Sequence, residues 1–205
     1  MEVLILAVKP QDLDSALREI ASLIDKKTLV ISIAAGRKLD WIESRLPSAR
    51  VIRVMPNLPC QVSEGMSVYC LGTQAKPVDA QTAETLLAGF GKVLALPESK
   101  FDAVTAISGS GPAFFTRFLE AIIAAGVEEG LSRDDALLLA RQTMLGTSRL
   151  LVETRQDPRH LIDSVASARG TTAAGLTIFD SGDLDKIVAE AIQAAAQRSR
   201  ELSEA

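Results

Sequence analysis

A cluster of small residues at positions 108–111, Ser-Gly-Ser-Gly, is the segment of this chain with the most unusual local composition. It runs directly into Pro112 and a long apolar stretch. Proline is favoured in the first turn of a helix because its missing N–H leaves no donor unsatisfied there. The pattern therefore predicts a loop with a permissive backbone, followed by the start of a long helix.

A second segment of this kind, Gly-Thr-Thr at residues 170–172, precedes another apolar helical pattern. The free N–H groups at a helix N-terminus bind carboxylates well, so this segment could hold an acidic ligand. Threonine is also a common residue at a helix start, where it caps the first turn. Capping and ligand binding are compatible, and the pattern leaves both open.

The first half of the chain alternates short apolar runs with segments of helical periodicity. Five apolar runs predict strands, at residues 3–8, 28–33, 50–55, 67–71 and 92–96. The first run is uninterrupted and rich in branched side chains, which is typical of a strand buried on both faces. Helical spacing lies between the runs, at residues 13–24, 39–46 and 78–90. Such repetition of strand, helix and strand is typical of a parallel sheet with right-handed crossovers.

The second half of the chain has helical patterns almost throughout. We therefore expect an α/β domain over residues 1–97 and an all-α domain over residues 98–205. Ser132, followed three positions later by Asp135, resembles a capping box and predicts the start of one helix. A last amphipathic helix follows Gly182. The apolar bands are wide, and they fit both an internal core and a contact with another subunit.

The composition of the chain excludes several classes of function. Its 205 residues are 47% hydrophobic and 23% charged, which is a globular profile. A net charge of −4 and an aromatic content of 4% argue against binding to nucleic acid or to an anionic membrane. No apolar run approaches the roughly 20 residues that span a bilayer. The chain also begins without the basic region of a signal peptide, so we expect a cytoplasmic protein without membrane contact.

Side chains that bind metals or undergo redox chemistry are few. Cys60, Cys70 and His160 are the complete set of cysteines and histidines, whereas a structural zinc site usually takes four such ligands, so we expect no metal. The two cysteines could form a disulfide in principle, but two reduced thiols in a cytosolic protein are favoured. His160 follows Asp157 and Pro158 at a predicted helix start, which favours a solvated first-turn residue over a catalytic base.

Six segments, taken in order, resemble the pyrroline-5-carboxylate reductase family across residues 2–202. They lie at residues 6–10, 32–36, 53–59 with 64–65, 102–105, 108–113, and 170–172 with 181–182. The resemblance implies a partial Rossmann-like sheet followed by a helical dimerisation domain. It also implies reduction of 1-pyrroline-5-carboxylate to L-proline with NADPH or NADH, the last step of proline biosynthesis, in a homodimer or higher homo-oligomer.

The glycine-rich turn with which this family binds its dinucleotide, G-x-G-x-x-G after a strand, does not occur in these 205 residues. A dinucleotide-binding sheet normally opens with a strand, that turn and a helix. We therefore interpret residues 1–97 as the C-terminal part of an NAD(P)-binding Rossmann-like domain. Either the start lies upstream of Met1 or the chain is a shortened relative.

The resemblance assigns cofactor binding to the loops that follow the first three strands. Hydride transfer requires the nicotinamide to lie close to the imine carbon, and ligands of open α/β sheets bind at the carboxyl ends of the strands. Small side chains there let the ring approach the backbone, while Lys9 could offset phosphate charge or remain a solvated loop lysine. The assigned residues are Ala7, Val8, Lys9, Pro10, Ile33, Ala34, Ala35 and Asn57.

The resemblance assigns substrate binding to Glu98, Ser164, Gly170, Thr171 and Thr172. The hydroxyl of Thr172 is the candidate catalytic group, as the hydrogen-bond partner of the ring nitrogen. Ser164 stands where the family has asparagine, and Arg169 stands where it has glycine. A side chain at position 169 matters if the backbone there needs positive φ, although Arg169 could instead bind the substrate carboxylate.

Two other functions stay open at this point. A non-catalytic relative that keeps the dimerisation domain but has lost cofactor binding is favoured by the absent glycine-rich turn and by Arg169. A reductase that acts on a different imine or carbonyl substrate is favoured by Ser164 and Arg169.

Overall fold

The structure is a computed structural model that describes residues 2–204, and side chains over residues 2–203. The chain divides into two compact units. The first, which we call the sheet unit, comprises the residues up to 112 together with those from 191 onward, and the second, the helical unit, comprises residues 113–190. The domain boundary that we expect near residue 98 stays a prediction, because a division into compact units does not test whether each part is a separate domain.

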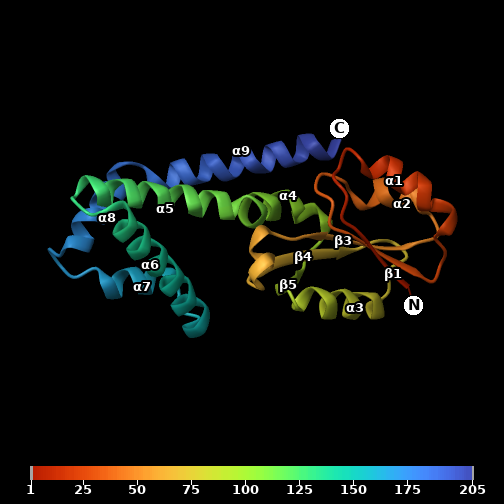
Figure 1. The fold of residues 1–205 in the computed structure, drawn as a ribbon, viewed down its shortest axis with the longest axis horizontal. Coiled ribbons are helices and arrows are strands. Elements are labelled where there is room, and N and C mark those ends of the chain that lie inside the picture. The colour runs from red at the N-terminus through yellow and green to blue at the C-terminus, as the bar shows by residue number, and fades with distance from the viewer. Residues whose placement is uncertain (1, 205) are drawn as a thin grey trace. The chain divides into compact units, whose positions relative to one another are not determined.

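The sheet unit contains a five-stranded sheet in the order β1-β2-β3-β4-β5 (Figure 1). The strands are β1 (Glu2–Leu6), β2 (Thr28–Ser32), β3 (Arg50–Met55), β4 (Gly65–Leu71) and β5 (Gly91–Ala95). All five predicted strands are therefore confirmed, with ends that differ by a few residues. An α/β region followed by helices is also the predicted fold class.

One strand pair departs from the predicted parallel sheet. β1–β2, β2–β3 and β4–β5 are parallel, but β3 and β4 are antiparallel, with Val54 opposite Tyr69. The connection between them is residues 56–64, a loop and the short 3₁₀ helix η2 (Leu58–Val62). A parallel connection needs a crossover of about a dozen residues or more, so this shorter link reverses the chain direction instead.

Helices cover both faces of the sheet (Figure 1). On one face α1 (Leu13–Ile20), α2 (Leu39–Arg45) and α4 (Phe101–Val104) share a core with alternate strand residues such as Val30 and Val51. On the other face α3 (Pro77–Ala88) packs on the remaining alternate residues, including Ile52 and Val54. Every residue of β2 is buried, because it has neighbours on both edges and both faces.

The expectation that the first strand is buried on both faces is wrong for the chain described here. β1 lies at the edge of the sheet and pairs with β2. Leu6 is buried on the side of α1, but Val3 and Ile5 are 39% and 53% exposed. The reason is that α3 packs chiefly against β3 and β5, so it leaves this part of the opposite face uncovered.

The remaining helices are α5 (Gly111–Glu128), α6 (Arg133–Thr154), α7 (Pro158–Val165), α8 (Thr171–Ser181) and α9 (Leu184–Glu204). The predicted cap at Ser132 is confirmed, since its hydroxyl accepts a hydrogen bond from the Asp135 N–H at 3.1 Å. His160 is exposed in the first turn of α7, as predicted. None of the helices in the described part of the chain has the length and hydrophobicity that a bilayer crossing requires.

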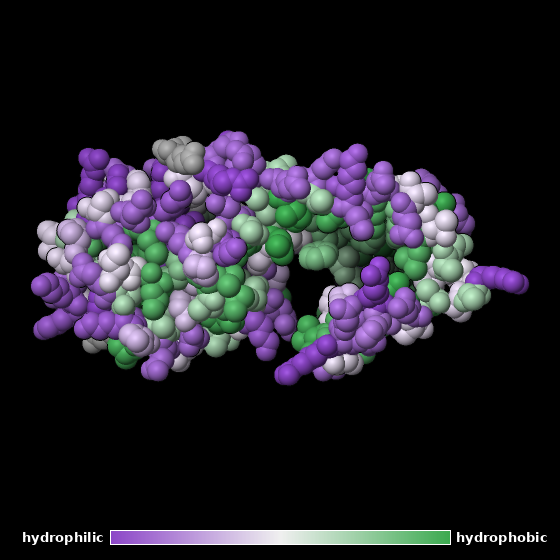
Figure 2. Space-filling model, turned by 180° about the vertical axis from the view of Figure 1, so that it is seen from behind, coloured by the Kyte–Doolittle hydropathy of each residue, from purple (hydrophilic) through white to green (hydrophobic). Residues whose placement is uncertain are grey.

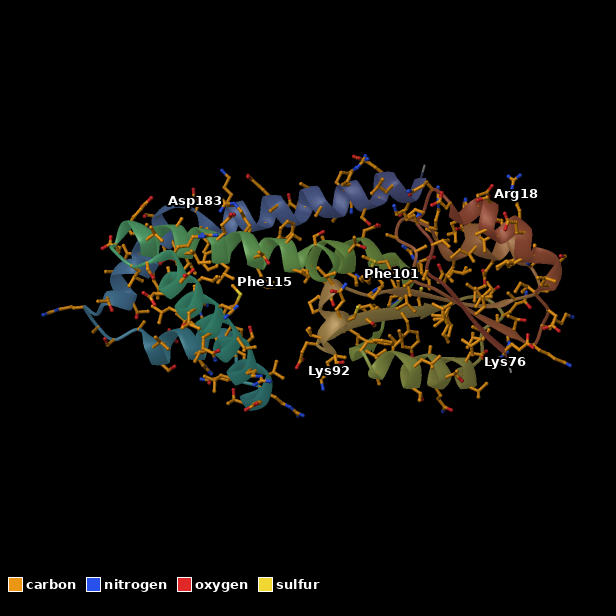
Figure 3. The ribbon with its side chains drawn as sticks, in the orientation of Figure 1. Arg18, Lys76, Lys92, Phe101, Phe115 and Asp183 are labelled. Atoms are coloured by element: carbon orange, nitrogen blue, oxygen red, sulfur yellow. The ribbon has the colours of Figure 1, made fainter. Side chains whose placement is uncertain are left out.

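Much of the apolar surface of the helical unit is uncovered in the single chain, as the green areas over that unit in Figure 2 show. Its internal core consists of a few small contacts around Ile123, Ala136 and Ala140. By contrast Phe115, labelled in Figure 3, is 66% exposed, and Ile122 on the same helix is 44% exposed. Such apolar exposure is typical of a surface that another protein covers.

Candidate functional site

The predicted cofactor loops lie together at the carboxyl ends of β1 and β2. The Ile33 N–H donates to the Leu6 carbonyl oxygen at 3.1 Å, so the ladder between the strands continues into the loops. Around this bond Ala7, Val8, Lys9 and Ala35 are exposed, Pro10 and Ile33 are partly buried, and Ala34 is buried. The edge therefore presents accessible backbone, small side chains such as Ala7 and Ala35, and the exposed Lys9, which suits the approach of a dinucleotide.

The end of helix α9 packs behind the second loop. Gly36 has φ +70°, and a Cβ there would come within 3.3 Å of the Leu202 carbonyl oxygen. The Ser199 hydroxyl donates to the Asp102 carboxylate at 2.7 Å, which anchors α9 to α4. Sequence patterns alone gave no indication of this contact, because its partners lie 97 positions apart.

The segment before α5 is a π-helical turn, Thr105–Gly109, rather than the loop that we expected. Its defining bond runs from the Ser110 N–H to the Thr105 carbonyl oxygen at 2.8 Å. A Cβ on Gly109 would lie 2.7 Å from the Met55 methyl carbon, so glycine permits a close approach to the end of β3. Small residues here serve tight packing as well as backbone freedom.

Asn57 follows β3 at the same edge of the sheet, and its carboxamide is engaged within the chain. Its Nδ2 donates to the main-chain oxygen and the hydroxyl of Ser108, at 3.2 and 3.3 Å. Its Oδ1 accepts the Met66 N–H at 2.8 Å. A cofactor contact through this side chain stays a prediction, and it would have to share the amide with these partners.

Glu98 takes part in a network that the sequence analysis missed. Its Oε1 accepts hydrogen bonds from the Arg53 guanidinium and from the Leu39 N–H, both at 2.7 Å. Arg53 is 5% exposed, and its guanidinium lies 4.7 Å from the ring centroid of Phe101, which Figure 3 labels at the start of α4. The available signal was the position of Arg53 in the middle of a strand, between apolar residues, since a buried charge requires a partner. The predicted substrate contact of Glu98 stays a prediction.

Cys70 lies next to this network and is a buried, free thiol. Burial, together with the nearby Glu98 charge and against a smaller opposing effect of Arg53, raises the pKa of the Cys70 thiol to about 12. The folded chain therefore keeps Cys70 protonated up to strongly alkaline pH, and protonated thiols are poor nucleophiles. We expect iodoacetamide at pH 8 to modify the partly buried Cys60 before the buried Cys70, with peptide mapping as the measurement. Faster labelling of Cys70 in the folded protein would contradict its burial.

The other predicted substrate residues lie in the helical unit. Gly170 is the N-cap of α8, and no side chain caps this helix. Because the Ala174 N–H is the first to bond back, to the Gly170 carbonyl oxygen, the preceding N–H groups of the first turn have no partner within the helix. A Cβ on Gly170 would overlap the Ser167 hydroxyl and would lie 3.1 Å from the Ser167 carbonyl oxygen, so a larger residue here would require Ser167 to shift.

Thr172, in this first turn, lines an open cavity of about 600 Å³. The other lining residues come from α6, α7 and α8, and they are mostly apolar. Thr171 is exposed, and the Ser164 hydroxyl donates back to the Leu161 carbonyl oxygen within α7. The structure thus brings Gly170, Thr171 and Thr172 together. They lie in a different compact unit from Glu98 and the cofactor loops.

Arg169 has φ +62°, in the left-handed region that favours glycine. The condition raised by the sequence, that position 169 requires a positive φ, is therefore met. A non-glycine residue in this conformation costs about 1–2 kcal/mol. Arg169 is exposed, so its side chain is available to solvent beside the start of α8.

Replacing Arg169 by glycine is expected to stabilise the chain by about 1 kcal/mol, because relief of backbone strain exceeds the entropy gained by the unfolded state. Differential scanning calorimetry measures this effect. Arg169→Ala is the matched control, since it removes the guanidinium but keeps the Cβ and therefore the strain. Equal stability of both variants would show that the conformation at 169 is not strained.

Comparison with known proteins supports one family throughout. The family description "Pyrroline-5-carboxylate reductase dimerisation" matches residues 98–202. A pyrroline-5-carboxylate reductase of Arabidopsis thaliana is 42% identical over 203 residues, which cover 99% of this chain and 74% of that protein. Pyrroline-5-carboxylate reductase 1 of Bacillus subtilis is 38% identical over 205 residues, covering 100% and 69%.

Solved structures agree with the sequence comparisons. A pyrroline-5-carboxylate reductase from Coxiella burnetii superposes with a TM-score of 0.94 at 34% identity, covering 98% of this chain and 76% of that one. The Plasmodium falciparum pyrroline carboxylate reductase with NADP bound gives a TM-score of 0.91 at 32% identity, covering 98% and 77%. Because these matches extend over almost all of the sequence, the chain belongs to the pyrroline-5-carboxylate reductase family.

Proposed function

We propose that this chain reduces 1-pyrroline-5-carboxylate to L-proline with NADPH or NADH, the last step of proline biosynthesis. The observation that carries the proposal is the identity of about 40% to named pyrroline-5-carboxylate reductases over essentially the whole chain. The small, exposed loops at the carboxyl ends of β1 and β2 and the uncapped start of α8 support it, since both suit the ligands of this reaction.

The carboxyl edge of the sheet fits part of a nicotinamide dinucleotide. Ala7, Val8 and Ala35 leave the backbone open to a flat ring, and the exposed Lys9 is placed to offset phosphate charge. When bound, the dinucleotide supplies the hydride that the imine carbon receives. The role of these residues is to bind it and hold it at the edge.

The start of α8 provides the groups that the substrate needs. Its free N–H groups and the positive end of the helix dipole are suited to the substrate carboxylate. The Thr172 hydroxyl, in the same turn, is suited to hydrogen-bond the ring nitrogen. As the imine carbon gains the hydride, that nitrogen gains a proton, and a donor held there favours the step.

The experiment that tests the proposal measures NADPH oxidation by the purified chain with and without 1-pyrroline-5-carboxylate. Size-exclusion chromatography on the same sample establishes that the protein is folded. Oxidation that depends on the substrate supports the proposal. A folded chain that oxidises neither NADPH nor NADH when 1-pyrroline-5-carboxylate is present would contradict the proposal.

A related imine or carbonyl substrate is the second candidate, and the exposed Arg169 beside the start of α8 favours it. A guanidinium recognises carboxylates in a bidentate manner, so a substrate with a second acidic group would gain from it. Profiling cyclic imino acids with one and with two carboxylates distinguishes the candidates. A preference for the second class that Arg169→Ala abolishes would favour this alternative.

The family match and the exposed apolar face support a homodimer or a higher homo-oligomer. We expect Ile122→Glu to shift the protein toward monomer, because it places a charge on that face. Light scattering after size-exclusion chromatography measures the mass. Leu23→Glu, at a 76% exposed position in the sheet unit, is the control and should leave the mass unchanged. An unaltered mass for Ile122→Glu would remove this face from the interface.

We also propose a cytoplasmic location. The support is that Cys60 and Cys70 are both free thiols, which is usual in reducing compartments. Subcellular fractionation of the native host tests this, and recovery in a membrane or secreted fraction would contradict it.

A further inference from the structure

The carboxamide of Asn57 joins three segments of the sheet unit. Asn57 itself lies in the loop after β3, Met66 lies in β4, and Ser108 lies in the π-helical turn before α5. Both kinds of polar group on the amide are used, since Nδ2 donates twice to Ser108 and Oδ1 accepts once from Met66. The main-chain oxygen of Asn57 also accepts the Cys60 N–H, at 3.2 Å. The Asn57 side chain is therefore held by Ser108 through Nδ2 and by Met66 through Oδ1.

The turn that Asn57 holds has a second contact with the same strand end. Gly109 approaches Met55 so closely that a Cβ would lie 2.7 Å from the methionine methyl carbon. A π-helical turn is rare, and it frequently marks a functional position in a helix. The hydrogen bonds from Asn57 and the close approach of Gly109 thus both join this turn to the end of β3.

The place of this contact in the fold connects it with the candidate cofactor edge. β3 pairs in parallel with β2, with Arg53 opposite Ser32, so the loops after the two strands are neighbours. Ligands of open α/β sheets bind in the crevice outside those strand ends. A displacement of the π-helical turn would therefore alter the wall of the cofactor edge without removing any residue from it.

We propose that Asn57 is a positioning residue, which acts by holding Ser108 and the π-helical turn against the carboxyl edge of the sheet. This inference rests on the proposed reductase function. It differs from a direct cofactor contact, because a direct contact would require the amide to give up bonds that the chain already makes. The two roles predict different kinetics.

The variants that test the inference separate the two halves of the amide. Asn57→Asp keeps the oxygen that accepts from Met66 but replaces the group that donates to Ser108. Ser108→Ala removes one of the two acceptors and leaves the main-chain oxygen. Gln61→Glu makes the same amide-to-carboxylate change at an exposed position of η2, and it serves as the control.

The kinetic measurement is kcat together with KM for NADPH and for 1-pyrroline-5-carboxylate. We expect Asn57→Asp to lower kcat about tenfold or more, because small misplacements at a hydride-transfer site are costly. KM for NADPH should stay within about twofold of the parent value. Combining Asn57→Asp with Ser108→Ala should lower kcat by less than the product of the two single fold-changes, since both changes act on the contact between Asn57 and Ser108.

Amide hydrogen exchange provides a readout that does not depend on activity. In Asn57→Asp we expect faster exchange at Ser110, whose N–H closes the π-helical turn, while the Met66 N–H remains protected. Ser108→Ala, a milder change, should move exchange at Ser110 in the same direction. Gln61→Glu should change neither.

Each other outcome overturns a definite part of the inference. A raised KM for NADPH with unchanged kcat would make Asn57 a direct cofactor contact. Additive effects of the two changes would show that Asn57 and Ser108 act independently, which would overturn the positioning role. Unchanged exchange at Ser110 would show that Asn57 does not hold the turn. Faster exchange with unaltered kinetics would leave the contact structural. A folded parent chain without reductase activity would overturn the proposed function, and the positioning role with it.

Discussion

Replacing Thr172 by alanine is expected to lower kcat for 1-pyrroline-5-carboxylate reduction about a hundredfold, the usual cost of removing one hydrogen-bond donor from a reacting centre. Thr172 lies in the first turn of α8 and lines the cavity between α6, α7 and α8. Within the part of the chain that the structure describes, its hydroxyl has no hydrogen-bond partner whose loss would cost stability. The loss should therefore fall on turnover, and stopped-flow or steady-state NADPH oxidation measures it.

Two variants on the same helix separate a role in the reaction from a role in folding. Thr172→Ser keeps the hydroxyl and should retain most of the activity. Thr177→Ala removes an exposed hydroxyl that donates to the Ala173 carbonyl oxygen within α8, and it should leave kcat near the parent value. Parent-like turnover in Thr172→Ala would remove Thr172 from the catalytic role. An equal loss in Thr177→Ala would indicate a general disturbance of α8.

Local sequence patterns predicted the elements well where one physical signal dominated. β3 has the predicted bounds, residues 50–55, because its apolar run ends at a proline. The direction of β4 was not predicted correctly, since direction depends on the length of the connection rather than on the strand's own residues. The exposure of Val3 and Ile5 also lay beyond local reasoning, because burial depends on which elements cover a strand.

In the candidate site, too, features set by a single residue could be predicted, whereas contacts between distant residues could not. The conformation at Arg169 could be anticipated, because replacement of a glycine raises a specific question about φ. The bonds of Asn57 to Ser108 and of Arg53 to Glu98 could not, because they join residues 51 and 45 positions apart. Sequence patterns identify which side chains could do chemistry, whereas the fold decides which of them hold one another in place.

Removing the Glu98 carboxylate is expected to destabilise the folded chain by about 3 kcal/mol, the lower end of the cost of breaking a buried ion pair. Glu98→Ala would leave the Arg53 guanidinium, whose side chain is 6% exposed, without its anion. The lower end applies because the Glu98 side chain is itself 28% exposed. The Leu39 N–H would lose its acceptor as well. Urea unfolding followed by circular dichroism measures the free energy of unfolding.

The double variant Arg53→Leu with Glu98→Ala decides between the structural and the substrate role of Glu98. If the cost of Glu98→Ala comes from the unpaired arginine, an apolar residue at 53 should recover much of the stability, because it no longer buries a charge. If Glu98 instead contacts substrate, Glu98→Ala should raise KM for 1-pyrroline-5-carboxylate, and the second change should not restore it. A stable Glu98→Ala chain with raised KM would assign Glu98 to the substrate alone, whereas a destabilised chain with parent KM would assign it to the fold. Glu98→Gln keeps an acceptor for Leu39, so its stability should lie between those of the parent and Glu98→Ala.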